Sequence, residues 1–233
     1  MATITSVKSG NWSDPTVWNS GTVPVDGDTV VSANHTITLD VDITQPNTLL
    51  TSTGGGGRYD YSGTGTRTVT ARANAGTHAV AGLFRMNGTG TLTIVGPVSG
   101  GSATSAYGVY NITSGTVILT TATGGSGSNS HGVYNVGSGT VIVTTATGGS
   151  GVNAYGVHNS NNGSVIITTA AGGDGNNASG AFNNANGPMA VDLAVGNNFG
   201  DGVIVYGTYG VVNNNAISNK VTVRRLRFGS HGF

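Results

Sequence analysis

The residues with the clearest catalytic potential in this chain are its nine acids, and every one of them is an aspartate. A glycoside hydrolase needs two carboxylates about 5 to 9.5 Å apart across the scissile bond. Asp174 and Asp192 are two of the three acids in the repetitive region, and their spacing along the chain is shorter than the period of the repeat described below. Stacked repeats would not bring the two carboxylates together, so we expect no catalytic residues and no enzyme activity.

Metal-binding patterns are also incomplete. Asp26 and Asp28 flank a glycine beside a proline, which is typical of a turn rather than of a hard-cation site. Three glycine-rich loops resemble the calcium-binding nonapeptide β-roll, but they carry Asn at the ligand position and return at a much longer spacing. They also lack the Lys of a phosphate loop. We expect no metal and no cofactor, and we expect the glycines to supply positive φ at tight corners. The loops are residues 124–129, 148–153 and 172–177.

Aromatic side chains recur in two rows and are the best candidates to contact a receptor or a partner protein. One row is Tyr107, His131 and Tyr155, and the other is Tyr110, Tyr134 and His158. Rings with a polar atom are favoured at protein interfaces and in sugar recognition. The alternative is that both rows pack in the core or at turns.

The elements that position these rings are three copies of one unit. Residues 107–111 (YGVYN) return as 131–135 (HGVYN) and 155–159 (YGVHN), which defines a 24-residue period without any insertion. Each copy is followed by a β-branched run such as residues 140–147, and Gly or Ser clusters separate the runs. A fixed period of this length predicts a solenoid of strands and turns, that is, an all-β parallel β-helix.

Stacking at about 4.8 Å would place like residues over one another in parallel register. Buried asparagines can then form amide ladders, as in cross-β stacks. We therefore interpret the asparagine that recurs in each unit as a structural turn ladder rather than as a binding site. Its members are Asn111, Asn135, Asn159 and Asn183.

Strand parity predicts a partner. If Val117 and Leu119 face the core, the side chain between them faces outward, since successive residues of a strand alternate. The outward row is then Ile118, Ile142 and Ile166. With the opposite parity, the valine and leucine positions would face outward instead. Continuous apolar parallel strands are usually covered on both faces. We expect a second copy of the chain to cover this row, with a loop of the same chain as the lesser alternative.

Composition narrows the class of protein. Charged residues are 8% of the chain and there is no cysteine. No basic start followed by an apolar core marks a secretory signal, and no apolar run is long enough to insert into a membrane. Residues 220–228 hold four of the nine Lys and Arg residues. Without a wider basic field this segment favours a closing strand over a nucleic-acid contact.

The N-terminal segment carries a resemblance. Trp12 and Trp18 flank an Asp-Pro turn and are expected to plug one end of the solenoid. Residues 9–42 resemble the start of the glycine-rich β-strand domain at the head of many extracellular and phage parallel β-helix proteins. The matching positions are Trp12, Trp18, Gly21, Pro24, Gly27, Asp28, Val30, Ile37, Leu39 and Asp40.

The 24-residue repeats are likewise similar to those of phage tail fibres, tailspikes and other surface proteins with a right-handed parallel β-helix. Both resemblances imply an extracellular or virion-exposed structural role. The resemblance to phage fibres also implies that the copies associate as a homotrimer. We expect a virion structural protein, either a tail-fibre or tailspike component or a capsid decoration protein, that contacts other virion proteins and attaches to host-surface glycans. A protein made in a host cytoplasm and released inside a virus particle needs no export signal.

Three alternatives stay open. They are a bacterial cell-surface adhesin, an ice-binding solenoid and a polysaccharide-degrading β-helix enzyme. The ice-binding alternative rests on Thr121-Ala-Thr123 stacked over Thr145-Ala-Thr147, although the next unit reads Thr-Ala-Ala.

The chain divides into four expected regions. Residues 1–50 form a cap and the first strands, and residues 51–80 form a glycine-rich crossing segment. Residues 81–215 form the β-helix repeats, and residues 216–233 form a basic C-terminal strand and tail.

Overall fold

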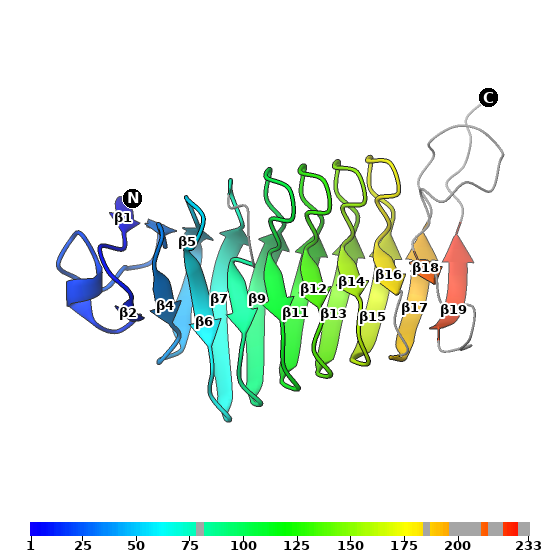
Figure 1. Ribbon diagram of the computed structural model, residues 1–233, viewed down its shortest axis with the longest axis horizontal. Helices are drawn as coiled ribbons and strands as arrows, with labels where there is room; N and C mark the ends of the chain where they lie inside the picture. Colours follow the sequence, from blue (N-terminus) through cyan, green and yellow to red (C-terminus); the bar gives the residue numbers. More distant parts are fainter. Residues whose placement is uncertain (78–81, 184–186, 196–210, 214–220, 228–233) are drawn as a thin grey trace.

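A computed structural model of the chain describes residues 1–77, 82–183, 187–195, 211–213 and 221–227. The strands stack side by side along one long axis, with the N-terminus at one end (Figure 1). They form a ten-stranded and a nine-stranded sheet, and every described strand pair within the two sheets is parallel. The protein is therefore a parallel β-solenoid, as the repeat predicts.

The ten-stranded sheet contains the longer strand of each coil. In spatial order its strands are β1 (Thr3–Thr5), β3 (Thr29–Val31), β5 (Ile43–Thr51), β7 (Thr66–Asn74), β9 (Thr91–Ser99), β11 (Thr116–Thr123), β13 (Thr140–Thr147), β15 (Ser164–Ala171), β17 (Met189–Val195) and β19 (Val221–Arg227).

The nine-stranded sheet contains the shorter strands. They are β2 (Gly10–Asn11), β4 (Thr36–Thr38), β6 (Arg58–Tyr61), β8 (Phe84–Met86), β10 (Val109–Asn111), β12 (Val133–Asn135), β14 (Val157–Asn159), β16 (Ala181–Asn183) and β18 (Val211–Asn213).

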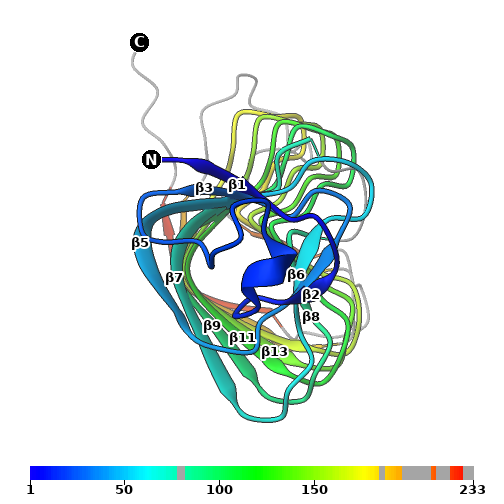
Figure 2. The same ribbon diagram turned by 90° about the vertical axis from the view of Figure 1, so that its left-hand side faces the viewer.

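The central coils keep the predicted register. Val117 lies opposite Val141, and Val141 lies opposite Val165, so each pair is separated by one period of the sequence repeat. Seen along the long axis, β9, β11 and β13 nest behind one another (Figure 2). The core between the sheets is built from stacked apolar rows, and the row of Val109, Val133 and Val157 is fully buried. Each coil buries its apolar side chains only because its neighbours cover them.

The predicted asparagine ladder is confirmed. Asn111 Nδ2 donates to Asn135 Oδ1 at 2.9 Å, and Asn135 Nδ2 donates to Asn159 Oδ1 at 2.9 Å. Asn159 Nδ2 continues the ladder to Asn183 Oδ1 at 3.0 Å and also donates to the backbone carbonyl of Gly163. All four side chains are buried. The ladder satisfies polar groups inside the turns, so it has a structural role.

The stack begins earlier than the repeats suggest. Residues 51–80, expected to be a crossing segment, contribute the whole of β6 and β7 to the two sheets. The coil offset varies here, with Thr3 opposite Thr29, Thr29 opposite Leu49 and Thr66 opposite Thr91. A sequence repeat cannot reveal coils whose lengths differ, because like residues no longer recur at one spacing. At the other end, β19 pairs with β17, so the described part of the basic segment is the edge strand of the ten-stranded sheet.

The loop glycines act differently from the prediction. The positive φ angles at the central loops belong to Asn129, Asn153 and Asn177, at 55°, 53° and 57°. Asparagine tolerates this conformation better than most residues because its short side chain can bond locally. A Cβ on Gly124 or Gly148 would instead lie 2.2 or 2.1 Å from a backbone carbonyl oxygen. These glycines are required by the close approach of one coil to the next.

The N-terminal end is closed by two tryptophans. Trp12 and Trp18 flank the 3₁₀ helix η1 (Pro15–Val17), and each is 2% exposed. Their rings meet edge to face at 5.1 Å, and Trp18 Nε1 donates to the Trp12 carbonyl at 3.0 Å. The Trp12 ring also lies 6.1 Å from the ring of Tyr59 in the core. The pair therefore covers apolar surface at the N-terminal end of the stack.

Candidate functional site

The predicted aromatic rows lie together and form what we call the aromatic ladder. Its members are Tyr107, Tyr110, His131, Tyr134, Tyr155, His158 and Phe182. Tyr110, Tyr134 and His158 are the middle residues of β10, β12 and β14, each between a buried Val and a buried Asn. Strand alternation therefore places them on the outer side of the nine-stranded sheet.

The rings of the ladder cover one another. His131 stacks between Tyr107 at 5.3 Å and Tyr155 at 5.0 Å, with interplanar angles of 7° and 11°. Tyr134 lies between Tyr110 at 5.7 Å and His158 at 4.8 Å. Sugar recognition uses an open ring face, whereas the faces of His131 and Tyr134 already contact neighbouring rings. The geometry favours the packing alternative for the interior of the ladder.

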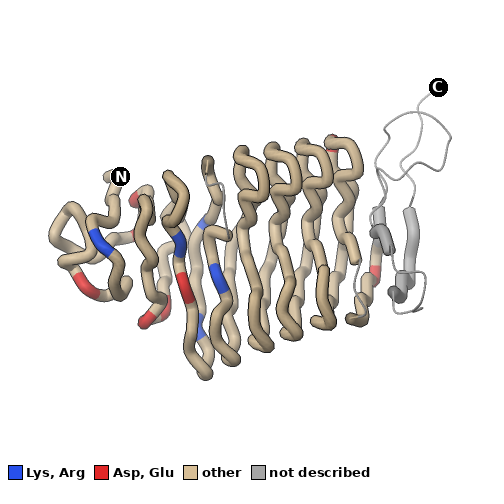
Figure 3. Tube along the Cα trace, in the orientation of Figure 1, with Lys and Arg blue, Asp and Glu red and all other residues tan. Residues whose placement is uncertain are grey.

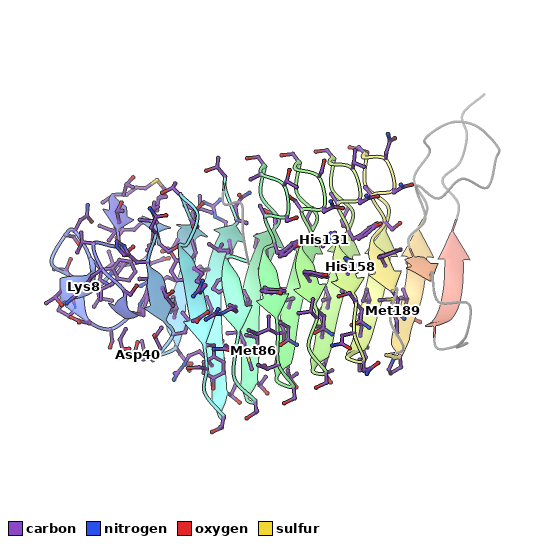
Figure 4. All side chains as sticks on the ribbon, in the orientation of Figure 1. Lys8, Asp40, Met86, His131, His158 and Met189 are labelled. Carbon is purple, nitrogen blue, oxygen red and sulfur yellow. The ribbon has the colours of Figure 1, made fainter. Side chains whose placement is uncertain are left out.

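Two histidines of the ladder are hydrogen-bonded to each other (Figure 4). The backbone N–H of Tyr155 donates to His131 Nδ1 at 3.2 Å, so His131 carries its proton on Nε2. That N–H donates to His158 Nδ1, 3.0 Å away. Burial, followed by the nearby charge of protonated His158, holds the pKa of His131 well below its ordinary value. Burial also raises the pKa of the Tyr107 and Tyr155 hydroxyls.

The outward side of β11, β13 and β15 is the second candidate surface, which we call the threonine–isoleucine face. Val141 and Val143 are buried and Ile142 between them is half-buried, as strand parity predicts. Ile118 is also half-buried, and Ile166 is 47% exposed. The alternation breaks once in each strand, because two successive threonines avoid the core. Thr120 and Thr121 show this in β11.

A groove of about 780 Å³ runs along the corners that follow β7 to β15. Hydroxyls and backbone groups line it, notably Ser99, Ser102, Thr123, Ser126, Thr147 and Ser150. Asp174 lies at one end of this lining, whereas Asp192 lies on β17. The two aspartates singled out from the sequence therefore occupy different elements.

The N-terminal carboxylates are engaged by backbone and amide donors. Asp28 accepts from the N–H groups of Ala2 at 3.0 Å and Val25 at 3.1 Å. Asp26 accepts from Asn47 through both its backbone and its side chain, at 2.8 Å each. The Asn47 hydrogen bonds lower the pKa of Asp26. Within the described residues, no group of three or more His, Cys, Asp or Glu side chains is placed to hold a metal ion.

Sequence reasoning missed two neighbours of the aromatic ladder. Phe182 pairs in register with His158, one repeat period further along the chain, and was recoverable from the repeat. The other is an ion pair in which Arg85 Nε donates to Asp60 Oδ1 at 2.7 Å. Asp60 pairs in register with Arg85, and Arg85 with Tyr110, so the pair continues the outer column of the ladder. No signal reveals it, because these early coils do not share the period of the central repeats.

The comparisons with known proteins give no match: no family model fits the chain, and no curated protein or solved structure is significantly similar. The class is therefore defined by the fold alone, and it is that of the parallel β-solenoids. In the described part of the chain, no helix has the length and apolar character needed to cross a membrane.

Proposed function

We propose that this chain is a virion structural protein, a tail-fibre or tailspike component or a capsid decoration protein, whose copies associate through the threonine–isoleucine face. The observation that carries the proposal is the outward row of Ile118, Ile142 and Ile166 on an uncharged surface. Residues 86–173 contain no Lys, Arg, Asp or Glu. In Figure 3 the basic residues, drawn in blue, and the acidic residues, drawn in red, lie mainly in the N-terminal coils.

Charged side chains usually keep an exposed sheet surface from associating with another protein. Proteins that must stay monomeric place charged side chains on exposed sheet surfaces and edges. The threonine–isoleucine face has none, and Val95 on the neighbouring strand β9 adds a side chain that is 44% exposed. A second copy of the same face would cover these apolar groups without burying an unpaired charge. Three copies around one axis give the homotrimer expected from the resemblance to phage fibres.

Attachment to a host-surface glycan belongs to the same proposal. Because the inner ring faces of the aromatic ladder are covered, a sugar would meet ring edges and hydroxyls, such as those of the half-buried Tyr110 and Tyr134. The interaction with other virion proteins would use surfaces outside the threonine–isoleucine face.

The test compares the wild type with Ile142→Lys by light scattering and circular dichroism. The wild type should have three times the chain mass of 23.1 kDa, and the variant should be a folded monomer, because the charge falls at the interface and not in the core. Ser138→Lys, on an exposed turn of the same coil, is the matched control and should remain trimeric. A wild type that is a soluble monomer at micromolar concentration would refute self-association.

A second candidate function, ice binding, rests on the same face. Thr121, Thr145 and Thr169 stack in register, as do Thr123 and Thr147, and these five threonines are the array that the sequence motif implies. The test is thermal hysteresis of the purified protein, with Thr145→Lys as the variant that should abolish it. The absence of thermal hysteresis would exclude ice binding. If the protein were also a monomer, both functions proposed for the threonine–isoleucine face would be excluded.

A further inference from the structure

The two histidines of the aromatic ladder replace a ring pair that recurs across the coils. In each such pair, the first ring precedes the short strand of one coil. The second ring belongs to the middle residue of the short strand in the following coil. The centroids of Tyr107 and Tyr134 are 4.8 Å apart in this arrangement. The corresponding centroid distances are 4.7 Å between His131 and His158, and 4.4 Å between Tyr155 and Phe182. Only the middle pair consists of imidazoles, whose ordinary pKa lies near neutral pH.

In the neutral pair, the unprotonated nitrogen of each imidazole, Nδ1, already accepts a hydrogen bond. His131 Nδ1 accepts from the backbone N–H of Tyr155, and His158 Nδ1 accepts from His131 Nε2. A doubly protonated imidazole has only donors. Protonation of His131 would therefore set a donor against the Tyr155 N–H, and protonation of His158 at Nδ1 would set a donor against His131.

The surroundings of His131 do not compensate an imidazolium charge. His131 is 3% exposed. The pair is enclosed by Tyr107 of the preceding coil, by Tyr134 and Tyr155 of the two coils that contain the histidines, and by Phe182 of the following coil. Residues 86–173 contain no carboxylate. The same column also contains Asp60 and Arg85, which are bound to each other, and Arg85, with the same sign as an imidazolium, lies between Asp60 and Tyr110. Burial without an opposite charge disfavours the protonated form.

We propose that His131 and His158 form an acid-sensitive latch between the coils of β12 and β14, which holds at neutral pH and opens when either imidazole is protonated. Opening breaks the His131–His158 hydrogen bond or the bond from Tyr155, and with it the ring stacking that joins the two coils. The protein would then loosen at the middle of its aromatic ladder while the asparagine ladder still holds the core side of the same strands.

The lowered pKa of His131 sets the direction of the effect. The unfolded chain binds a proton near the ordinary histidine pKa of about 6.5, whereas the folded chain resists it. The stabilisation is therefore complete above about pH 6.5 and is lost progressively as the pH falls below that value.

The test uses the full chain and the double variant His131→Tyr/His158→Tyr, which restores the residue type of the neighbouring coils. Urea midpoints are measured at about pH 7.5 and about pH 5, on either side of the histidine pKa. The wild type should lose stability between the two, and the double variant should lose clearly less. Equal losses in the two proteins would overturn the latch. The other three histidines are unchanged, so the comparison isolates the pair.

A measurement on the wild type alone keeps the proposal testable if the double variant does not fold. Nitrogen NMR of the imidazoles should show Nε2–H tautomers for both histidines at neutral pH. Amide exchange, corrected for the intrinsic pH effect, should show at least tenfold less protection of the Tyr155 N–H at about pH 5, with the Tyr59 amide in an early coil as control. Unchanged protection of Tyr155, or a charged His131 at neutral pH, would contradict the latch.

Discussion

Asn135→Asp tests the buried asparagine ladder with the smallest change of shape. The new carboxylate can still accept from Asn111, but it cannot donate to Asn159 Oδ1, which now accepts from Asn135 at 2.9 Å. One hydrogen bond is lost at a net cost of about 1 kcal/mol, and the acceptor on Asn159 is left facing a carboxylate. The buried charge without a counter-ion adds about 3 kcal/mol more.

The expected loss of unfolding free energy is therefore about 4 kcal/mol at neutral pH. With a urea m-value of about 2 kcal/mol/M, the midpoint should fall by about 2 M. Unfolding is followed by circular dichroism, because the strand signal comes from all coils. Asn162→Asp, an exposed asparagine of the next turn, is the control and should change the midpoint little. If Asn135→Asp and Asn162→Asp unfold together, the ladder does not hold the turns.

Two further substitutions test the coil register and the corners. Val141→Asp places a charge in the fully buried row between Val117 and Val165, and it should cost several kcal/mol in urea unfolding; a wild-type midpoint would show that the register is wrong. Gly148→Ala puts a Cβ 2.1 Å from a backbone oxygen of the next coil, so it should destabilise far more than Gly55→Ala, where nothing lies within 4 Å. Similar midpoints for these two variants would contradict the proposed close approach at the corners.

The central coils could be predicted because each position has its counterpart one repeat period away. That spacing alone places Asn135 over Asn111, and strand alternation places Ile142 between two buried valines. Both follow from local geometry that every central coil repeats. The early coils could not be predicted in this way, because a small change in coil length removes the sequence repeat while the strands still pair.

The chemistry of the aromatic ladder was only partly visible in the sequence. The repeat shows the two rows of rings. The His131–His158 contact joins one ring from each row, so predicting it requires the spatial offset between the rows, which the sequence does not contain. The loop glycines show a similar limit. Their spacing indicates a corner, whereas the reason for each glycine, a backbone oxygen of the adjacent coil, depends on how closely two corners approach.

The central claim, that copies of this solenoid assemble within a virus particle, is tested most directly by imaging the native assembly. Electron cryo-microscopy of particles from the culture that produces the protein should show three solenoids in a tail structure or on the capsid. Their ten-stranded sheets should face one another at Ile118, Ile142 and Ile166. Finding the protein instead on a bacterial cell surface, or finding these sheets open to solvent in the particle, would contradict the account.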